Sequence, residues 1–287
     1  MLSDPDCLRV IVRYGEKVMR GGAHIDALNK AAERFMEEHG NPGIPCSTEA
    51  NSQGTKCLLK VQSVPERFDV QFGVMVGDAV HCFRSALDQL VSALWTDELT
   101  NYTGFPVCHT ERDWVINGPR MYWSVPAPYL AVINRAQPYH RGDAKAARNH
   151  PLAILHSLWN LDKHRTIPTV ALTARRLDID VEEEHGIRIG DFKPRLGVVL
   201  KPGAVIAEAK IKSVDPNVPE AHVKVKAHMA LAVSFGDGGE LPEAVRSQPV
   251  AKAFHDVIAP AMARVVDDLT DVQRGVPFRS EWDAAEA

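Results

Sequence analysis

Apolar residues recur every three to four positions along four stretches of the chain. The most regular stretch covers residues 68–99. Its apolar face carries Phe72, Val76, Val80, Phe83, Leu87, Leu90 and Leu94. The same spacing predicts helices over residues 16–39, 151–165 and 250–273, and Pro260 is expected to kink the last of these helices. Each predicted helix has one apolar side to bury, so we expect the four helices to share one core.

The spacing changes between residues 167 and 235, where β-branched residues become frequent and turn signals divide the chain. Four or five antiparallel strands are expected there, over residues 169–173, 177–181, 197–200, 205–211 and 222–234. A further short strand is expected within residues 55–64. Frequent glycines and prolines predict that residues 101–128 are irregular. Residues 129–135 are expected to form a short helix.

These elements predict an α+β fold, with a four-helix bundle core and a small antiparallel β-sheet inserted before the last helix. The expected divisions are a helical bundle part over residues 1–166 and an inserted sheet over residues 167–238. Residues 239–287 are expected to return a helix to the bundle and to end in a tail.

Composition indicates a soluble protein of the cytoplasm. The 287 residues carry a net charge of −4, which argues against binding duplex nucleic acid through bulk positive charge but leaves room for a local basic groove. The five cysteines form no Cys-x-x-Cys pair, a pattern typical of reduced thiols. An apolar run long enough to cross a membrane is missing from the sequence, so no membrane partner is expected.

Two polar stripes concentrate the groups that are able to perform chemistry. On the helix of residues 68–99 the stripe contains His81, Arg84 and Asp88, spaced so that they lie about one turn apart. On the helix of residues 151–165 the stripe contains His156, Asn160, Lys163 and His164. Facing helices would bring these two stripes together.

A basic segment precedes the second of these helices. Its cations are Arg141, Lys145 and Arg148, and Arg165 follows the helix. Positive side chains at the rim of a polar site are typical of contacts to nucleic-acid phosphates, so these four residues are the expected nucleic-acid-binding positions.

Common catalytic motifs are missing from the sequence: it has no phosphate-binding P-loop, no dinucleotide-binding glycine pattern, no Gly-x-Ser-x-Gly elbow and no His-Glu-x-x-His. A metal site built from His81, Asp88, His156 and His164 is disfavoured, because no helix carries two of the expected ligands at the usual spacing. Neither a metal nor another cofactor is therefore expected.

Four sequence islands resemble a family of uncharacterised bacterial and phage proteins. The islands are Phe83-Arg-Ser-Ala-Leu-Asp-Gln-Leu, Phe105-Pro-Val, Gln137-Pro-Tyr and Leu158-Trp-Asn-Leu-Asp-Lys-His-Arg165. This resemblance spans residues 70–166 and implies common descent but no activity.

A weaker similarity is to the HEPN superfamily, whose ribonuclease members are helical bundles that use an Arg followed by four to six residues and a His. Arg84 lies on a fitting helix, but the positions where that histidine would fall are Gln89, Leu90 and Val91. The similarity thus implies a helical bundle and RNA as a partner, whereas the catalytic motif itself is incomplete.

Two functional hypotheses follow. In the first, the protein binds or processes single-stranded RNA without a metal: Arg84 stabilises phosphate charge, and His81, His156 or His164 acts as general acid or base. In the second, a network that includes Arg84, Asp88, Asn160 and His164 fixes the packing of the helices. The protein would then be a non-catalytic interaction module, and a homodimer is one possible form of it.

Overall fold

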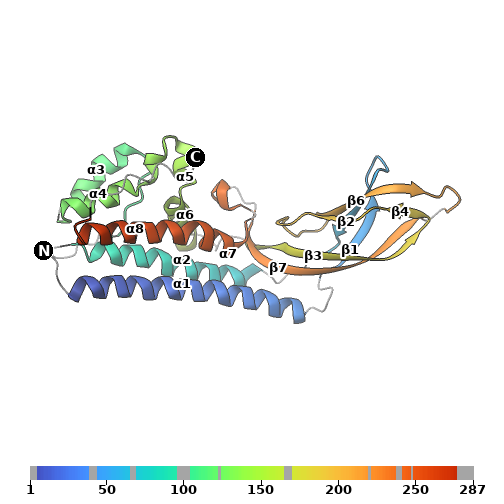
Figure 1. Ribbon diagram of the computed structural model, residues 1–287, viewed down its shortest axis with the longest axis horizontal. Helices are drawn as coiled ribbons and strands as arrows, with labels where there is room; N and C mark the ends of the chain where they lie inside the picture. The colour runs from blue at the N-terminus through green and yellow to red at the C-terminus, as the bar shows by residue number, and fades with distance from the viewer. Residues whose placement is uncertain are drawn as a thin grey trace.

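The computed structural model describes residues 5–38, 44–64, 69–95, 104–121, 124–164, 170–218, 221–236, 241–246 and 248–276. Half of the chain is helical and a quarter is in strands, so the fold is α+β as predicted. Helices gather at one end of an elongated molecule, and a two-stranded ribbon leads from them to a small sheet at the other end (Figure 1).

The helices predicted from the spacing of three to four residues are all present. They are α1 (Pro5–Glu38), α2 (Asp69–Ser92), α6 (Pro151–His164) and a final helical stretch that ends in α8 (Ala259–Gln273). α1 packs along α2, and α2 packs against α6. The predicted apolar face of α2 is buried, because residues from Phe72 to Leu90 at this spacing are almost inaccessible to solvent.

α1 and α2 approach closely at Gly21, where an added Cβ atom would lie 2.7 Å from the ring of Phe83. The Phe83 ring in turn stacks on Phe254 with 5.0 Å between centroids. The two glycines at positions 21 and 22 do not interrupt α1, although helix propensity disfavours them. Tight packing of α1 on α2 at Gly21 offsets this intrinsic cost.

The last helical stretch has three consecutive parts: α7 (Val250–Lys252), the π-helical segment η3 (Ala253–Ile258) and α8. Pro260 lies in the first turn of α8. A proline has no N–H and its ring crowds the preceding turn, and the wider π-turn directly before it accommodates both effects. The irregularity predicted at Pro260 therefore takes the form of a π-helical turn.

Several short helices lie between α2 and α6. Helix α3 (Glu111–Met121) falls within the stretch predicted to be irregular, so that prediction was wrong for these residues. Thr110 caps it, because its hydroxyl accepts from the N–H of Asp113 at 3.1 Å. The other short helices are α4 (Ala127–Arg135), as predicted, the 3-10 turn η1 (Pro138–Arg141) and α5 (Ala144–Arg148).

The ribbon consists of β3 (Val170–His185) paired antiparallel with β7 (His222–Phe235). Register shifts interrupt the pairing near Ala174 and Val181. The two short strands predicted at residues 169–173 and 177–181 are thus parts of one long strand. The strand predicted at residues 197–200 forms only an isolated bridge, between Val199 and Thr173.

The sheet at the far end has the strand order β1-β2-β6-β4, and β5 also pairs with β6. Its strands are β1 (Cys46–Ala50), β2 (Lys56–Val61), β4 (Ile187–Ile189), β5 (Lys193–Pro194) and β6 (Val205–Val214). β1 and β2 precede α2 in the chain, and β2 pairs with β6 across about 150 residues, Leu58 opposite Glu208. The sheet therefore combines two distant parts of the sequence.

Candidate functional site

Arg84 and Asp88, one turn apart on α2, hold the backbone of Phe105. Nη2 of Arg84 lies 2.9 Å from Oδ1 of Asp88 and donates to the Phe105 carbonyl at 2.5 Å. The same carboxylate oxygen accepts from the Phe105 N–H at 2.7 Å. The Arg84 side chain is only 5% exposed. A buried guanidinium paired in this way fastens the segment at Phe105 to α2.

Gly104 makes this arrangement possible. A Cβ atom at this position would lie 3.2 Å from Oδ1 of Asp88 and 3.6 Å from Nη2 of Arg84. The first distance is closer than ordinary van der Waals contact, so a larger residue would push against the carboxylate.

Trp159 of α6 connects Arg84 with Lys163. The guanidinium carbon of Arg84 lies 5.2 Å from the centroid of the indole, and Nζ of Lys163 lies 3.8 Å from it. Cations at such distances from an aromatic ring are attracted to it. Because Lys163 is exposed, the contact extends from the buried α2–α6 interface to the surface.

His156 lies on α6 one turn before Asn160, and Nδ2 of Asn160 is 3.0 Å from Nε2 of the ring. With the amide in this orientation it donates, so Nε2 accepts and the proton of the neutral ring is on Nδ1. Nδ1 is buried and has no hydrogen-bond partner among the described residues. Burial, and then the charges of Arg84, His109 and Lys163, lower the pKa of His156 to about 4, so the ring is neutral at pH 7.

Two further histidines, His150 and His109, belong to the same set of electrostatically interacting residues as His156. Burial, followed by the charges of Arg141 and His109, lowers the pKa of His150 to about 3. Burial also lowers the pKa of His109, against the opposing effect of Asp113 and with a smaller contribution from Arg148. Arg141 and Arg148 of the basic segment therefore lie close enough to His150 and His109, respectively, to lower their pKa values.

His81 belongs to a different contact between α2 and α6. The imidazole is exposed and lies near Asp162 of α6. Burial and then Asp78 raise the pKa of Asp162, while His81 acts in the opposite direction. Gly77 lies against Asp162 in the same contact, which shows how closely the two helices approach there.

The basic segment forms part of a hollow of about 430 Å³ between α5, α6 and residues 241–246, here called the basic hollow. Lys145, Arg148 and Arg246 supply its positive charges, while Asn149 and Ser157 supply neutral polar groups. Its lining also contains the carboxylate of Glu243, which lies 3.1 Å from Nζ of Lys145. Three cations against one carboxylate leave an excess of positive charge.

α5, which carries Lys145 and Arg148, is held by its own N-cap. The Asp143 carboxylate accepts from the N–H groups of Lys145 at 2.7 Å and Ala146 at 2.8 Å, and these bonds lower its pKa. The cap thereby sets where both cations stand relative to α6.

Of the residues predicted from the two stripes, the structure brings together Arg84, Asp88, His156, Asn160 and Lys163. Arg165 and the side chain of His164 lie outside the described residues. Within the described part of the chain, no three His, Cys, Asp or Glu side chains are grouped in a way that would hold a metal ion.

The sequence interpretation missed four participants: the backbone of Phe105, the ring of Trp159 and the side chains of His109 and Arg246. Trp159 appears in the sequence only as part of the fourth island, and its spacing on the helix does not mark it as a partner of cations. The other three come from segments between helices, which no periodic pattern places in space. The Phe105-Pro-Val island was the one signal that pointed to that segment.

The helices described in the structure include none that is long and apolar enough to cross a membrane. Comparisons of the chain with protein-family models, curated proteins and solved structures found no match. The geometry of the site therefore carries the functional argument.

Proposed function

We propose that the helical part of this protein binds single-stranded RNA at the basic hollow and does not cleave it. The observation that carries the proposal is the concave surface of about 430 Å³ with Lys145, Arg148 and Arg246 on its walls. Paired cations in a concavity recognise phosphate, and Asn149 and Ser157 supply hydrogen-bonding groups beside them.

The distribution of charge favours a single strand over a duplex. The protein as a whole carries a net charge of −4, so long-range attraction to a duplex would be weak. The positive groups are local, as in proteins that follow one backbone. η1 packs against α5, and its Tyr139 and His140 rings lie 4.1 Å apart, offering an aromatic surface on which a base would stack.

Binding without cleavage is supported by the environment of His156. A general acid or base works best when its pKa is near the working pH, whereas the pKa of His156 is lowered to about 4. Arg84 is only 5% exposed and already engaged with Asp88 and Phe105, so it is poorly placed to receive a phosphate. In this proposal the Arg84–Asp88 pair has the structural role of fixing the helices and the Phe105 segment.

The proposal includes the arrangement expected from the sequence: α1, α2, α6 and α8 as one four-helix core of HEPN-like type. It also places the protein in the cytoplasm, where the four described free cysteines would stay reduced. A homodimer is compatible with RNA binding but is not required by it.

The test is fluorescence polarisation with a labelled oligouridylate of about 12 nucleotides. Arg148→Glu is expected to weaken binding at least tenfold and to reduce the dependence of affinity on salt, because a phosphate contact is lost. The matched control is Lys212→Glu, which changes another exposed cation, on β6, and is expected to change binding less than twofold.

Equal binding by the Arg148→Glu variant and the unmodified protein would show that the basic hollow is not the RNA site. The same reactions, run on denaturing gels, test for cleavage. Cleavage by the unmodified protein that disappears in His156→Ala would overturn the non-catalytic assignment.

A further inference from the structure

We propose that the far end of the molecule carries a second binding site, a groove beside β3 that takes an extended segment of a partner protein as an added strand. The segment would alternate apolar residues with Lys or Arg. This site is separate from the basic hollow and does not depend on RNA binding.

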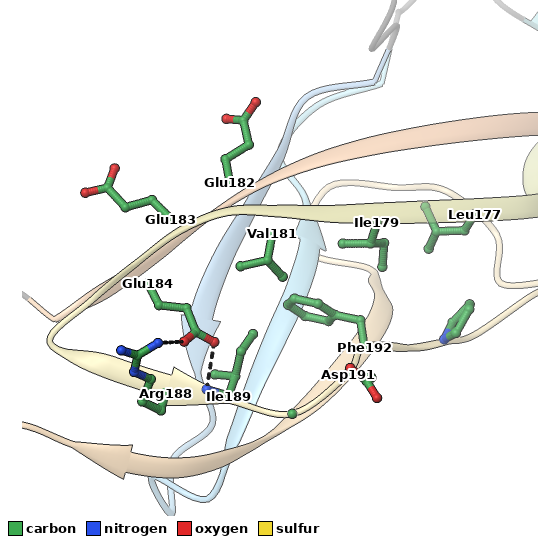
Figure 2. Close-up of a pocket in the computed structure, with 12 residues that line it drawn as sticks. Leu177, Ile179, Val181, Glu182, Glu183, Glu184, Arg188, Ile189, Asp191 and Phe192 are labelled. Carbon is green, nitrogen blue, oxygen red and sulfur yellow. Dashed lines mark hydrogen bonds and ion pairs between the residues drawn. The ribbon is translucent and has the colours of Figure 1, made fainter.

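The groove lies between β3 and residues 188–194, and its volume is about 540 Å³. Figure 2 shows the side chains of Leu177, Ile179 and Val181 directed from β3 into the groove, with Phe192 facing them. Val181 is 43% exposed although it is apolar. The groove thus offers an incompletely covered apolar wall.

Among the described residues, the outer edge of β3, on the side away from β7, is covered near its start. There the N–H of Leu200 donates to the carbonyl of Leu172 at 2.7 Å, and the N–H of Gly197 donates to that of Ala174 at 3.1 Å. Farther along, from Arg175 to Glu183, no other strand of the described residues pairs with this edge. An uncovered edge is a template for another strand.

β4 does not cover this edge, although it follows β3 directly. The chain turns at Gly186, whose φ of +64° favours glycine, and β4 then pairs with β6. Arg188 and Glu184 close that end of the groove with an ion pair of 3.1 Å. The edge of β3 therefore stays unpaired there among the described residues, and the groove lies next to it, against the face of β3 that carries Leu177, Ile179 and Val181 (Figure 2).

Charge complementarity defines the occupant. The opposite face of β3 carries exposed carboxylates at Asp178, Asp180 and Glu182. Arg176 pairs with Asp178 at 2.9 Å, and the remaining carboxylates leave an excess of negative charge. Figure 2 shows Glu182 and Glu183 directed away from the groove. An added strand places alternate side chains on opposite faces. Its groove-facing residues would therefore be apolar, while those on the other face would be basic.

β7 shows that this pattern suits β3. On the inner edge of β3, the sequence His222-Val-Lys-Val-Lys-Ala-His228 buries Val223 and Ala227 and exposes Lys224 and Lys226. Lys224 lies 3.7 Å from Glu182, and the His228 ring lies 4.0 Å from Asp180. At the outer edge, the same alternation of β3 side chains has no paired strand among the described residues.

The probe is a labelled synthetic peptide with the sequence of residues 222–229, added to the full-length protein. The expected result is saturable binding in fluorescence polarisation. A peptide with both lysines replaced by glutamate should bind at least tenfold more weakly, and Val181→Asp should weaken binding of the original peptide to a similar extent. The control is Val214→Asp, an apolar residue of β6 that is 52% exposed and does not line the groove.

Absence of peptide binding to the unmodified protein, or equal loss in the Val181→Asp and Val214→Asp variants, would overturn the proposal. Sedimentation velocity tests the alternative that a second copy of the chain fills the groove. A dimer that dissociates in Val181→Asp would replace the partner protein with self-association. Oligouridylate binding should be unchanged in Val181→Asp, so failure here is distinguishable from failure at the basic hollow.

Discussion

Replacing Asp88 with alanine tests whether the Arg84–Asp88 pair holds the fold together. The change leaves the guanidinium of Arg84, which is 5% exposed, without this carboxylate, and it removes the acceptor of the Phe105 N–H. Breaking a fully buried ion pair costs roughly 3–5 kcal/mol. Since the Asp88 side chain is 30% exposed, we expect the free energy of unfolding to fall by about 3 kcal/mol, toward the lower end of this range.

The measurement is urea unfolding followed by far-ultraviolet circular dichroism. With a slope of roughly 3 kcal/mol per molar urea for a chain of this size, the midpoint should fall by about 1 M. The control is Arg188→Ala, which breaks a pair of the same i,i+4 spacing whose arginine is 75% exposed, and it should cost less than about 0.5 kcal/mol. The double variant Arg84→Met, Asp88→Leu removes both charges and should lose less stability than Asp88→Ala.

The result that would refute the reasoning is a stability of Asp88→Ala within about 0.5 kcal/mol of the unmodified protein. The single variants Arg84→Met and Asp88→Leu are measured in the same way. A double variant that loses the sum of their two effects would also contradict the reasoning, because the two side chains would then act independently.

Two other predictions concern the helical part. Gly21→Ala should lower the free energy of unfolding by about 1–3 kcal/mol, since the new Cβ atom would lie 2.7 Å from the Phe83 ring. Gly22→Ala should raise it by about 0.5–1 kcal/mol, because no atom lies within 4 Å of the new Cβ atom. Equal effects of the two changes in urea unfolding would disprove the close approach at Gly21. His150 and His156 have pKa values lowered to about 3 and about 4 from 6.5, so below pH 6.5 the unfolded chain binds more protons than the folded chain. The free energy of unfolding should therefore be highest above pH 6.5 and fall as the pH drops toward 4. NMR titration should show the rings of His150 and His156 neutral at pH 5. A ring that titrates near 6.5 would contradict the lowered pKa values.

The sequence by itself determined the four long helices, because a long helix that buries one side repeats its apolar residues locally. Residues from Phe72 to Leu90 show this, and so does α6 beginning at Pro151. The i,i+4 spacing of Arg84 and Asp88 likewise indicated that the two side chains would lie close together. Both features depend on neighbours within a few residues.

Only the tertiary structure decided what lies against these local features. The Phe105 backbone completes the Arg84–Asp88 pair, and strand β2 joins β6 across about 150 residues. Within the described residues, the edge of β3 above the groove is unpaired because β4 pairs with β6 instead. Such contacts depend on how distant segments close against each other, and periodic spacing along the chain carries no information about that closure.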